Sequence, residues 1–409
     1  MSDSHYPGRP PVIMLTVASG MSPLAMALCI PALPVIGGEF AASPADTQYL
    51  VSGFLVGLGL SQPLLGACAD HAGRRPVILT AFAIFALASL ACIFAWNLAS
   101  LVGFRFLQAT GVAAGTVVAR AVIRDLAGAD HTTRYIAYLA AGMGLAPMVA
   151  PLIGGMLVEQ SGWRSTFTAA AVAAVLIWLW LFRSLPETVA RSGQRRGGSP
   201  LAKFARVAES RRFWSYTLLM GFSNSAYFMF SALAPAFFRD HFGIGAGGFG
   251  LYAGMLSLAY VSGAWLGAVV TRSQGPGRCL RLGLLGSGLG AALVLGWTVA
   301  GSQDLWTLTA FVVLMYGSAG LVNPPAMAGA MLEHADLAAS ASGLSSSVAL
   351  CVSALATVIG GYLYAGTAAS FGAPIAVTLF IAIGVYTLLA TGPAGTPVGA
   401  RPESSKADA

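Results

Sequence analysis

Long apolar stretches separated by short polar segments fill the chain from one end to the other. Each stretch is close to the twenty residues that a helix needs to cross the core of a bilayer. Gly, Pro and charged residues mark the ends of the stretches, and this punctuation predicts twelve membrane-spanning helices. The predicted spans are residues 11–36, 49–66, 76–95, 98–122, 135–158, 165–185, 213–238, 249–270, 280–300, 305–331, 339–364 and 374–390.

The longest hydrophilic stretch divides the predicted spans into six and six. It is rich in Gly, Ser and Arg, which is typical of a flexible linker. A polar motif after the second span has a weaker echo after the eighth, as expected for two related halves of a transporter. The predicted organisation is an N-terminal half at 1–185, a cytoplasmic linker at 186–212, a C-terminal half at 213–391 and a cytoplasmic tail at 392–409.

Composition restricts the class of protein. Of the 409 residues, 56% are hydrophobic and only 9% are charged, whereas a soluble globular chain carries about 25% charged residues. This excludes a soluble enzyme, a nucleic-acid-binding domain and a secreted disulfide scaffold. The fold class predicted from the sequence is therefore an all-α membrane protein.

The basic residues predict an orientation. The chain has 22 Lys and Arg residues and a net charge of +7. If both termini face the cytoplasm, only Arg164 and Arg239 lie outside and only Arg105 and Arg120 lie within a span. Cytoplasmic loops carry an excess of Lys and Arg, so a multi-pass inner-membrane protein with cytoplasmic termini is expected. The expected partners are the lipid bilayer and a small-molecule substrate, without nucleic acid, and the expected state is a monomer.

The sequence contains no recognisable catalytic or metal motif. Its five cysteines lie within or beside apolar stretches, without CxxC spacing, and are expected to be reduced packing thiols. HExxH, GxSxG and clusters of His and Cys are also absent from the sequence. We therefore expect neither an enzyme nor a bound metal or cofactor.

A tight polar turn between the second and third spans is the first candidate site. Its key residues are Gly66, Asp70, Gly73, Arg74 and Arg75. Asp70 can bond a neighbouring guanidinium or lie at the positive N-terminal end of another helix, such as the eleventh span near Ala339. A contact of this kind between the halves would close one access state and break in the other. The alternative is a solvated orientation signal.

The fourth span contains a costly charge. Arg105 lies within the span, where a guanidinium must be paired or must line a water-filled cavity. Gln108 follows one turn later and can bond across helices. Near the inner end, Arg120 and Arg124 share a face, and Asp125 is close enough to neutralise them or to titrate. A cluster of side chains that snorkel to the inner face is the alternative.

The fifth span should be bent. Pro147 and Pro151 lie four residues apart among glycines that include Gly142 and Gly155. Proline removes a backbone donor, so carbonyl groups are freed unless neighbours or water bond them. A merely kinked packing helix is the alternative.

Polar and aromatic residues on otherwise apolar spans are candidates for the lining of a substrate cavity. A drug pocket of broad specificity needs aromatic walls and few hydrogen-bonding groups. Each residue could instead bond between helices or, for tyrosine, anchor at the interface. Pro324 and Pro325 are expected to break the tenth span. The candidate lining residues are Gln62, Asn224, Tyr227, Tyr260, Tyr316 and Asn323.

Three of these segments resemble motifs of the major facilitator superfamily. They are Gly66-xxx-Asp70-xx-Gly73-Arg74-Arg75, Arg105-Phe-Leu-Gln108-Ala-Thr-Gly111 and the Gly/Pro-rich run from Gly142 to Gly155. The resemblance implies twelve helices in two six-helix halves that work by alternating access. In that family the bend of the fifth span is associated with antiport and with a sealed interface between the halves.

Further segments are similar to the bicyclomycin/chloramphenicol-resistance (Bcr/CflA) branch of drug:proton antiporters. They are Ile30-Pro-Ala-Leu-Pro34, Gln62, the run from Val118 to Leu126, and Leu185-Pro-Glu-Thr188. This resemblance implies multidrug efflux of small amphipathic compounds, such as antibiotics of the phenicol or bicyclomycin type, in exchange for protons.

One departure from that family concerns proton coupling. Where the first span of the family has an acidic residue, this sequence has Ala27. An antiporter needs a side chain that binds a proton and the substrate in turn. Among the remaining carboxylates, Asp125 is the favoured candidate for this role. The alternative is an exporter or facilitator in which Arg105 binds an anionic metabolite without proton exchange. The other candidate carboxylates are Asp46, Asp70 and Glu333.

Overall fold

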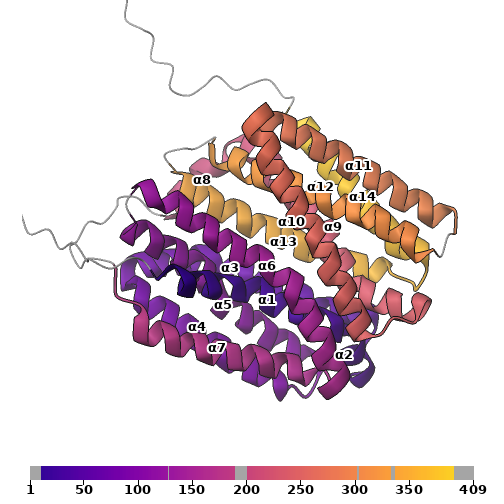
Figure 1. Cartoon of the computed structure of the whole chain (residues 1–409), viewed down its shortest axis with the longest axis horizontal. Coiled ribbons are helices and arrows are strands. Elements are labelled where there is room, and N and C mark those ends of the chain that lie inside the picture. Colours follow the sequence, from indigo (N-terminus) through magenta and orange to yellow (C-terminus); the bar gives the residue numbers. More distant parts are fainter. Residues whose placement is uncertain (1–10, 128, 189–199, 302–303, 333–336, 391–409) are drawn as a thin grey trace, which may run out of the picture.

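The computed structural model describes residues 11–127, 129–188, 200–301, 304–332 and 337–390, and their secondary structure is helical throughout. Figure 1 shows the helices as two adjoining groups, one from each half of the chain. The N-terminal group contains α1 (Val12–Cys29), the 3₁₀ turn η1 (Ile30–Ala32), α2 (Leu33–Glu39), α3 (Pro44–Ala72), α4 (Arg74–Ile93), α5 (Leu98–Leu126), α6 (Ala129–Ser161) and α7 (Arg164–Ser184). The C-terminal group contains α8 (Pro200–Ala208), α9 (Arg211–Phe242), α10 (Ala246–Gln274), α11 (Pro276–Val299), α12 (Leu305–Leu332), α13 (Ala338–Leu363) and α14 (Ala368–Ala390).

The helices agree with the predicted spans. In the described part of the chain, eleven segments are long and apolar enough to cross a membrane, with α1, η1 and α2 together forming the first. The remaining predicted span corresponds to α9, whose 32 residues extend about 48 Å. Its buried serines and threonine, among them Ser215, Thr217 and Ser225, lower its hydropathy. They are tolerated because α9 packs against α12, α13 and α14 inside the C-terminal group.

The linker is more ordered than its composition predicts. Residues 200–208 form the helix α8, so the prediction of a flexible linker is wrong for this segment. Its pattern is amphipathic, and Val207 is buried against Phe213, Ala330 and Ala341. The linker residues 189–199 and the tail from 391 onward lie outside the described ranges.

The predicted break in the tenth span does not occur. Pro324 and Pro325 lie inside the continuous helix α12. Pro325 lacks the N–H that would bond the carbonyl of Leu321, four residues earlier. Cys279 of α11 compensates, because its thiol donates to that carbonyl at 3.4 Å. A neighbouring side chain therefore satisfies the backbone group that the proline leaves free.

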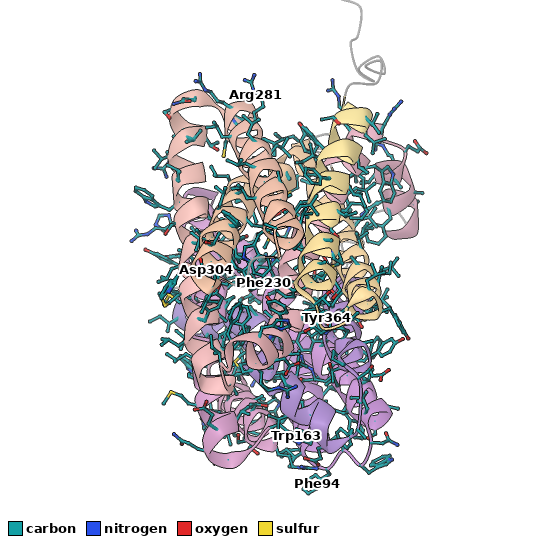
Figure 2. All side chains as sticks on the ribbon, turned by 90° about the vertical axis from the view of Figure 1, so that its right-hand side faces the viewer. Phe94, Trp163, Phe230, Arg281, Asp304 and Tyr364 are labelled. Carbon is teal, nitrogen blue, oxygen red and sulfur yellow. The ribbon has the colours of Figure 1, made fainter. Side chains whose placement is uncertain are left out.

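The two ends of the bundle are distinct. We call the end with the α3–α4 turn and α8 the inner end, which is the one predicted to face the cytoplasm, and the opposite end the outer end. Arg281 lies at the inner end in Figure 2, and Phe94 and Trp163 lie at the outer end. The halves meet through α6 on α10 and α3 on α13.

Close contacts between the halves gather toward the outer end. A Cβ on Gly155 would collide with the carbonyl of Ala246, and one on Gly361 would meet Gln48 at 2.5 Å. Tyr49 and Tyr362 bond hydroxyl to hydroxyl at 2.6 Å. The structure is therefore closed at its outer end, apart from a crevice of about 220 Å³ between α2, α3 and α9.

Within the N-terminal half, α5 is the central helix. It approaches α1 and α4 so closely that a Cβ on Gly115 would collide with the carbonyl of Ala18, and one on Gly111 would lie 2.5 Å from the backbone nitrogen of Phe85. Small residues permit this backbone approach, which is how helices associate in membranes.

The role of Gly115 can be tested directly. Gly115→Val should lower the free energy of unfolding by about 1–3 kcal/mol, because overpacking forces helices apart. Gly103→Val is the matched control on the same helix, since a Cβ there meets nothing within 4 Å. Thermal unfolding of the detergent-purified variants is the measurement. Equal melting temperatures for the two variants would contradict the packing role.

Candidate functional site

A small pocket lies between the two halves. In this conformation its cavity volume is only about 10 Å³, room for no more than one water molecule, and it is formed by side chains from α1, η1, α6, α9, α10 and α12. Because both halves contribute to it, its shape depends on how they are placed relative to each other. The lining residues are Ala27, Ile30, Pro151, Tyr227, Phe230, Ser231, Phe249, Ala253, Ser257 and Tyr316.

Aromatic rings form the wall of this pocket on the C-terminal side. The ring of Tyr316 lies 4.9 Å from that of Tyr227 and 5.8 Å from that of Phe230, measured between centroids. The Tyr316 hydroxyl is 3.2 Å from the hydroxyl of Ser231. Tilted and edge-on aromatic pairs of this kind are favourable beyond the area they bury. The wall is therefore a packed aromatic surface with few hydroxyl groups.

The pocket contains part of the predicted lining. Tyr227 and Tyr316 line it. Asn323 and Asn224 bond each other, with the Asn323 amide donating at 2.8 Å, and thereby join α12 to α9. Gln62 and Tyr260 are half-buried and lie outside the lining set.

The sequence reasoning missed Phe230, Ser231 and Ser257, which also line the pocket. One feature of the sequence pointed to two of them, because Phe230 and Ser231 lie on the most polar of the predicted spans.

The lining residues carry no formal charge. Ala27, the position at which the resembling family has an acidic residue, lines the pocket and is 4% exposed. It belongs to the same buried cluster as Phe230 and Tyr316. The place of the missing carboxylate is thus occupied by a methyl group against the aromatic wall, and this pocket is neutral.

The helix α6, which contains Pro147 and Pro151, forms one side of the pocket and joins the halves. Pro151 has no N–H, so the carbonyl of Pro147, four residues earlier, has no donor within the helix. The hydroxyl of Ser257 on α10 lies 3.0 Å from this carbonyl and 3.0 Å from the carbonyl of Ala253 in its own helix, and it shares its one proton between them. Pro151 therefore frees a backbone acceptor, and a hydroxyl of the other half lies within hydrogen-bond distance of it.

The glycines of the same motif act at two different interfaces. Gly155 faces α10, where a Cβ would collide with Ala246. Gly142 faces α1 within its own half, where a Cβ would lie 2.5 Å from the side chain of Thr16. Pro147, Pro151 and Gly155 therefore meet the C-terminal half, whereas Gly142 does not.

Arg105 lies inside the N-terminal half and is 1% exposed. Its guanidinium donates to the carbonyl of Ala25 at 3.2 Å, to the carbonyl of Leu50 at 3.5 Å and to the side chain of Gln108 at 2.6 Å. It also lies over the ring of Phe54, 4.2 Å from the centroid. Carbonyl dipoles and an aromatic face thus replace the carboxylate that a buried arginine usually needs.

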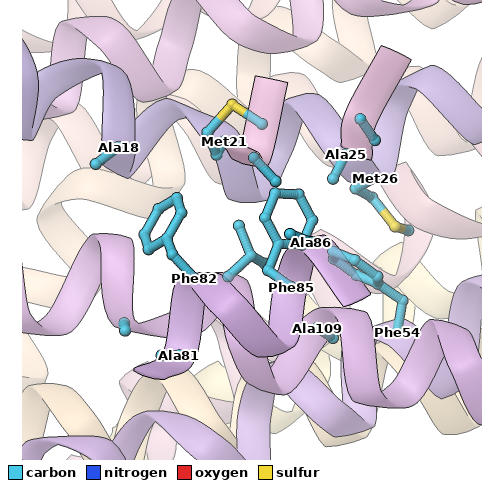
Figure 3. Close-up of a cluster of buried hydrophobic side chains, with 14 of the residues drawn as sticks. Ala18, Met21, Ala25, Met26, Phe54, Ala81, Phe82, Phe85, Ala86 and Ala109 are labelled. Atoms are coloured by element: carbon cyan, nitrogen blue, oxygen red, sulfur yellow. The ribbon is translucent and has the colours of Figure 1, made fainter. Parts of the chain in front are cut away.

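Gln108 extends this network to a fourth helix, since its amide donates to the hydroxyl of Ser89 at 2.8 Å. Figure 3 shows the surrounding cluster, with Ala25 and Met26 of α1 and Phe54 of α3 beside the rings of α4. Arg105 and Gln108 therefore tie α1, α3, α4 and α5 together. In this conformation the guanidinium faces the interior of one half and not the neutral pocket.

The predicted gate residues form an ion cluster at the inner end. Arg74 bonds Asp70 at 2.6 Å and Asp125 at 3.1 Å. The Arg74 side chain is 10% exposed, Asp125 is 29% exposed and Asp70 is 62% exposed. Asp125 therefore pairs with α4 and not with its neighbours Arg120 and Arg124, whose side chains are exposed. Gly66 packs near Val117 of α5.

A carboxylate that sequence reasoning left out of the site completes the cluster. Glu187 accepts from the backbone N–H groups of Arg74 at 3.0 Å and Arg75 at 3.2 Å, and so caps the start of α4. Gly73 has a φ of 101°, and a Cβ there would lie 2.6 Å from Glu187. Thr188 donates to Asp125 at 3.1 Å. The sequence contained an indication of this role, because Glu187 belongs to the Leu185-Pro-Glu-Thr188 motif.

These contacts join the N-terminal half to the first residues of the linker. The side chain of Ala339, the proposed partner region for Asp70 on the eleventh span, lies outside the described residues, as does Glu333. Asp46 lies at the outer end, where it forms a capping box with Ser43 at the start of α3. Asp46 therefore has a local role in starting a helix.

The network around Arg105 makes a specific prediction. Arg105→Lys should lower the free energy of unfolding by about 1–3 kcal/mol, because an ammonium cannot reproduce the planar fork that spans several acceptors. Lys203→Arg on α8 provides a control for the exchange of the two residue types. Thermal unfolding is the measurement. A melting temperature equal to that of the unaltered protein would show that the fork is dispensable.

Comparison with known proteins identifies the family. Residues 15–356 match the Major Facilitator Superfamily. A chloramphenicol resistance protein of Pseudomonas aeruginosa is 26% identical over 73% of this chain and 69% of its own length. Multidrug resistance protein D of Escherichia coli K12 is 26% identical over 81% of this chain and 84% of its own.

Solved structures agree with this at the level of the fold. A bacterial homolog of the human lysosomal transporter Spinster superposes with a TM-score of 0.74 at 16% identity, covering 94% of this chain and 96% of its own. The two groups of helices fit the same architecture. The chain belongs to the Major Facilitator Superfamily of membrane transporters and resembles its bicyclomycin/chloramphenicol-resistance branch.

Proposed function

We propose that the protein exports small, uncharged amphipathic compounds with aromatic character by alternating access, in exchange for protons. The observation that carries the proposal is the neutral, aromatic lining of the pocket between the halves, which is contracted in this state and must widen to admit a substrate. Aromatic walls bind varied apolar surfaces, and the hydroxyl groups of Tyr316, Ser231 and Ser257 offer a few hydrogen bonds for orientation. The names of the relatives, which include chloramphenicol and bicyclomycin resistance, support an antibiotic substrate of the phenicol or bicyclomycin type.

The contacts between the halves support alternating access. The outer end is held by backbone-close packing of α6 on α10, while the inner cluster around Arg74 is satisfied within one half. In the opposite state the inner end closes and the outer contacts separate. The pocket, which both halves line, is then exposed to the other side.

Asp125 is the proposed proton carrier. It shares Arg74 with Asp70 and also accepts from Thr188. Protonation of Asp125 would remove one of the two negative partners of Arg74, leaving the guanidinium to Asp70. A change of protonation would thereby alter the ion pairs at the inner gate, which is a physical route from proton binding to conformation.

The geometry gives less support to the alternative of anionic export through Arg105. A substrate anion would have to reach a side chain that is 1% exposed and whose donors already bond Ala25, Leu50 and Gln108. Binding there would require the N-terminal half itself to open.

Proton coupling is tested in liposomes with an imposed pH gradient and an interior pH dye. Adding chloramphenicol should cause proton flux with the unaltered protein and no flux with Asp125→Asn. Glu209→Gln is the matched control, because Glu209 is an exposed carboxylate on the same side of the bundle. Movement of labelled chloramphenicol without proton flux would contradict antiport, and a preference for carboxylate substrates would favour the anionic alternative.

The inner gate is tested by Asp70→Asn. This change should slow transport several-fold while leaving the amount of protein in the membrane unaltered, because the amide loses the charge that pairs with Arg74. Drug uptake into inverted vesicles, normalised to protein level, measures the effect. Unchanged transport would rule out a gating role for Asp70.

A further inference from the structure

The outer end of α10 lacks a cap of its own. The helix begins at Ala246 after Gly245, which has no side chain, and its first turn contains no acidic residue. The first N–H groups of a helix have no partner within the helix, and they carry a partial positive charge. A partner from elsewhere must therefore satisfy them, and a carboxylate is the most favourable one.

The other half of the protein supplies this carboxylate. Glu159, near the end of α6, accepts from the backbone N–H of Gly247 at 2.8 Å. The fit is tight, because a Cβ on Gly247 would collide with the Glu159 carboxylate and one on Gly245 would lie 3.3 Å from it. The absence of side chains at Gly245 and Gly247 therefore lets a residue from α6 cap the start of α10.

Glu159 differs from the other polar links across the outer end. Gln48 donates to the carbonyl of Ala232 at 3.3 Å, and Tyr49 bonds Tyr362. Ser257 donates to Pro147. Those links join neutral groups, whereas Glu159 places a charge on a helix terminus, and hydrogen bonds to charged groups are about twice as strong. Opening the outer end must break this bond, since its partners belong to different halves.

We propose that Glu159 is the latch of the outer gate, a carboxylate of one half that caps a helix of the other and so favours the outward-closed state. The latch rests on the proposed alternating access but on no particular substrate. Glu159 is a positioning residue and does not carry the coupling proton. It is exposed at the outer end. A proton that reached it from the outer side would leave to the same side and would not cross the membrane.

The test measures distances between nitroxide labels on the full chain in lipid nanodiscs, with the five native cysteines replaced. One pair, on Trp96→Cys and Ala365→Cys, spans the outer end, and a second pair, on His71→Cys and Gln274→Cys, spans the inner end. Glu159→Ala should raise the outward-open population about fivefold, the usual effect of losing a helix cap. The outer distance then lengthens as the inner distance shortens. Glu159→Gln, which keeps an acceptor, should have a smaller effect.

A second variant separates the latch from simple helix stability. Adding Gly245→Ser to Glu159→Ala gives α10 a cap of its own, and the extended backbone of Gly245 accepts a side chain. This pair should regain thermal stability while the outer distance stays long. Recovery of the short outer distance would contradict the latch proposal, because Glu159 would then act only by stabilising the start of α10.

Glu209→Gln, at the opposite end, is the control and should leave both distances unchanged. Distances unaltered in Glu159→Ala would contradict the proposal, as would loss of both distances together, which indicates unfolding. The distances are measured without substrate, so failure of the latch is distinguishable from failure of drug export.

Discussion

Polar groups inside a bilayer have no water to bond, so each must find its partner within the protein. Three solutions to this constraint organise the molecule. The carbonyl of Pro147, freed by Pro151, is bound by Ser257, and that of Leu321, freed by Pro325, is bound by Cys279. The charge of Arg105 is met by backbone carbonyls and an aromatic ring. Each solution fixes the place of one helix against another.

The two halves use their interiors differently. The N-terminal half is tied together by Arg105 and by glycines on α5, which makes it a unit that can move as one body. The C-terminal half contains an aromatic core, and Ala27, Leu28 and Ile30 of the first span pack into it. The neutral pocket forms where that first span and α6 meet the aromatic wall. Its chemistry therefore belongs to both halves and changes when they separate.

The two ends of the bundle are held by different kinds of contact. At the inner end, Arg74 bonds Asp125 of its own half and Glu187 at the start of the linker. At the outer end, glycine packing and Glu159 join the two halves. An end whose charged groups are satisfied locally can open without loss, whereas an end whose bonds cross the interface must break them. In this conformation the described charged and backbone-close contacts between the halves therefore lie at the outer end.

The sequence by itself indicated where the long helices lie and which polar positions needed a partner. It could do so because the length of an apolar run and the missing donor of a proline are local properties. Only the tertiary structure decided which partners those groups have. Glu159 and Gly247 are 88 residues apart, Ser257 and Pro147 are 110 apart, and Glu187 and Arg74 are 113 apart. No spacing rule connects such pairs, because the packing of whole helices brings them together.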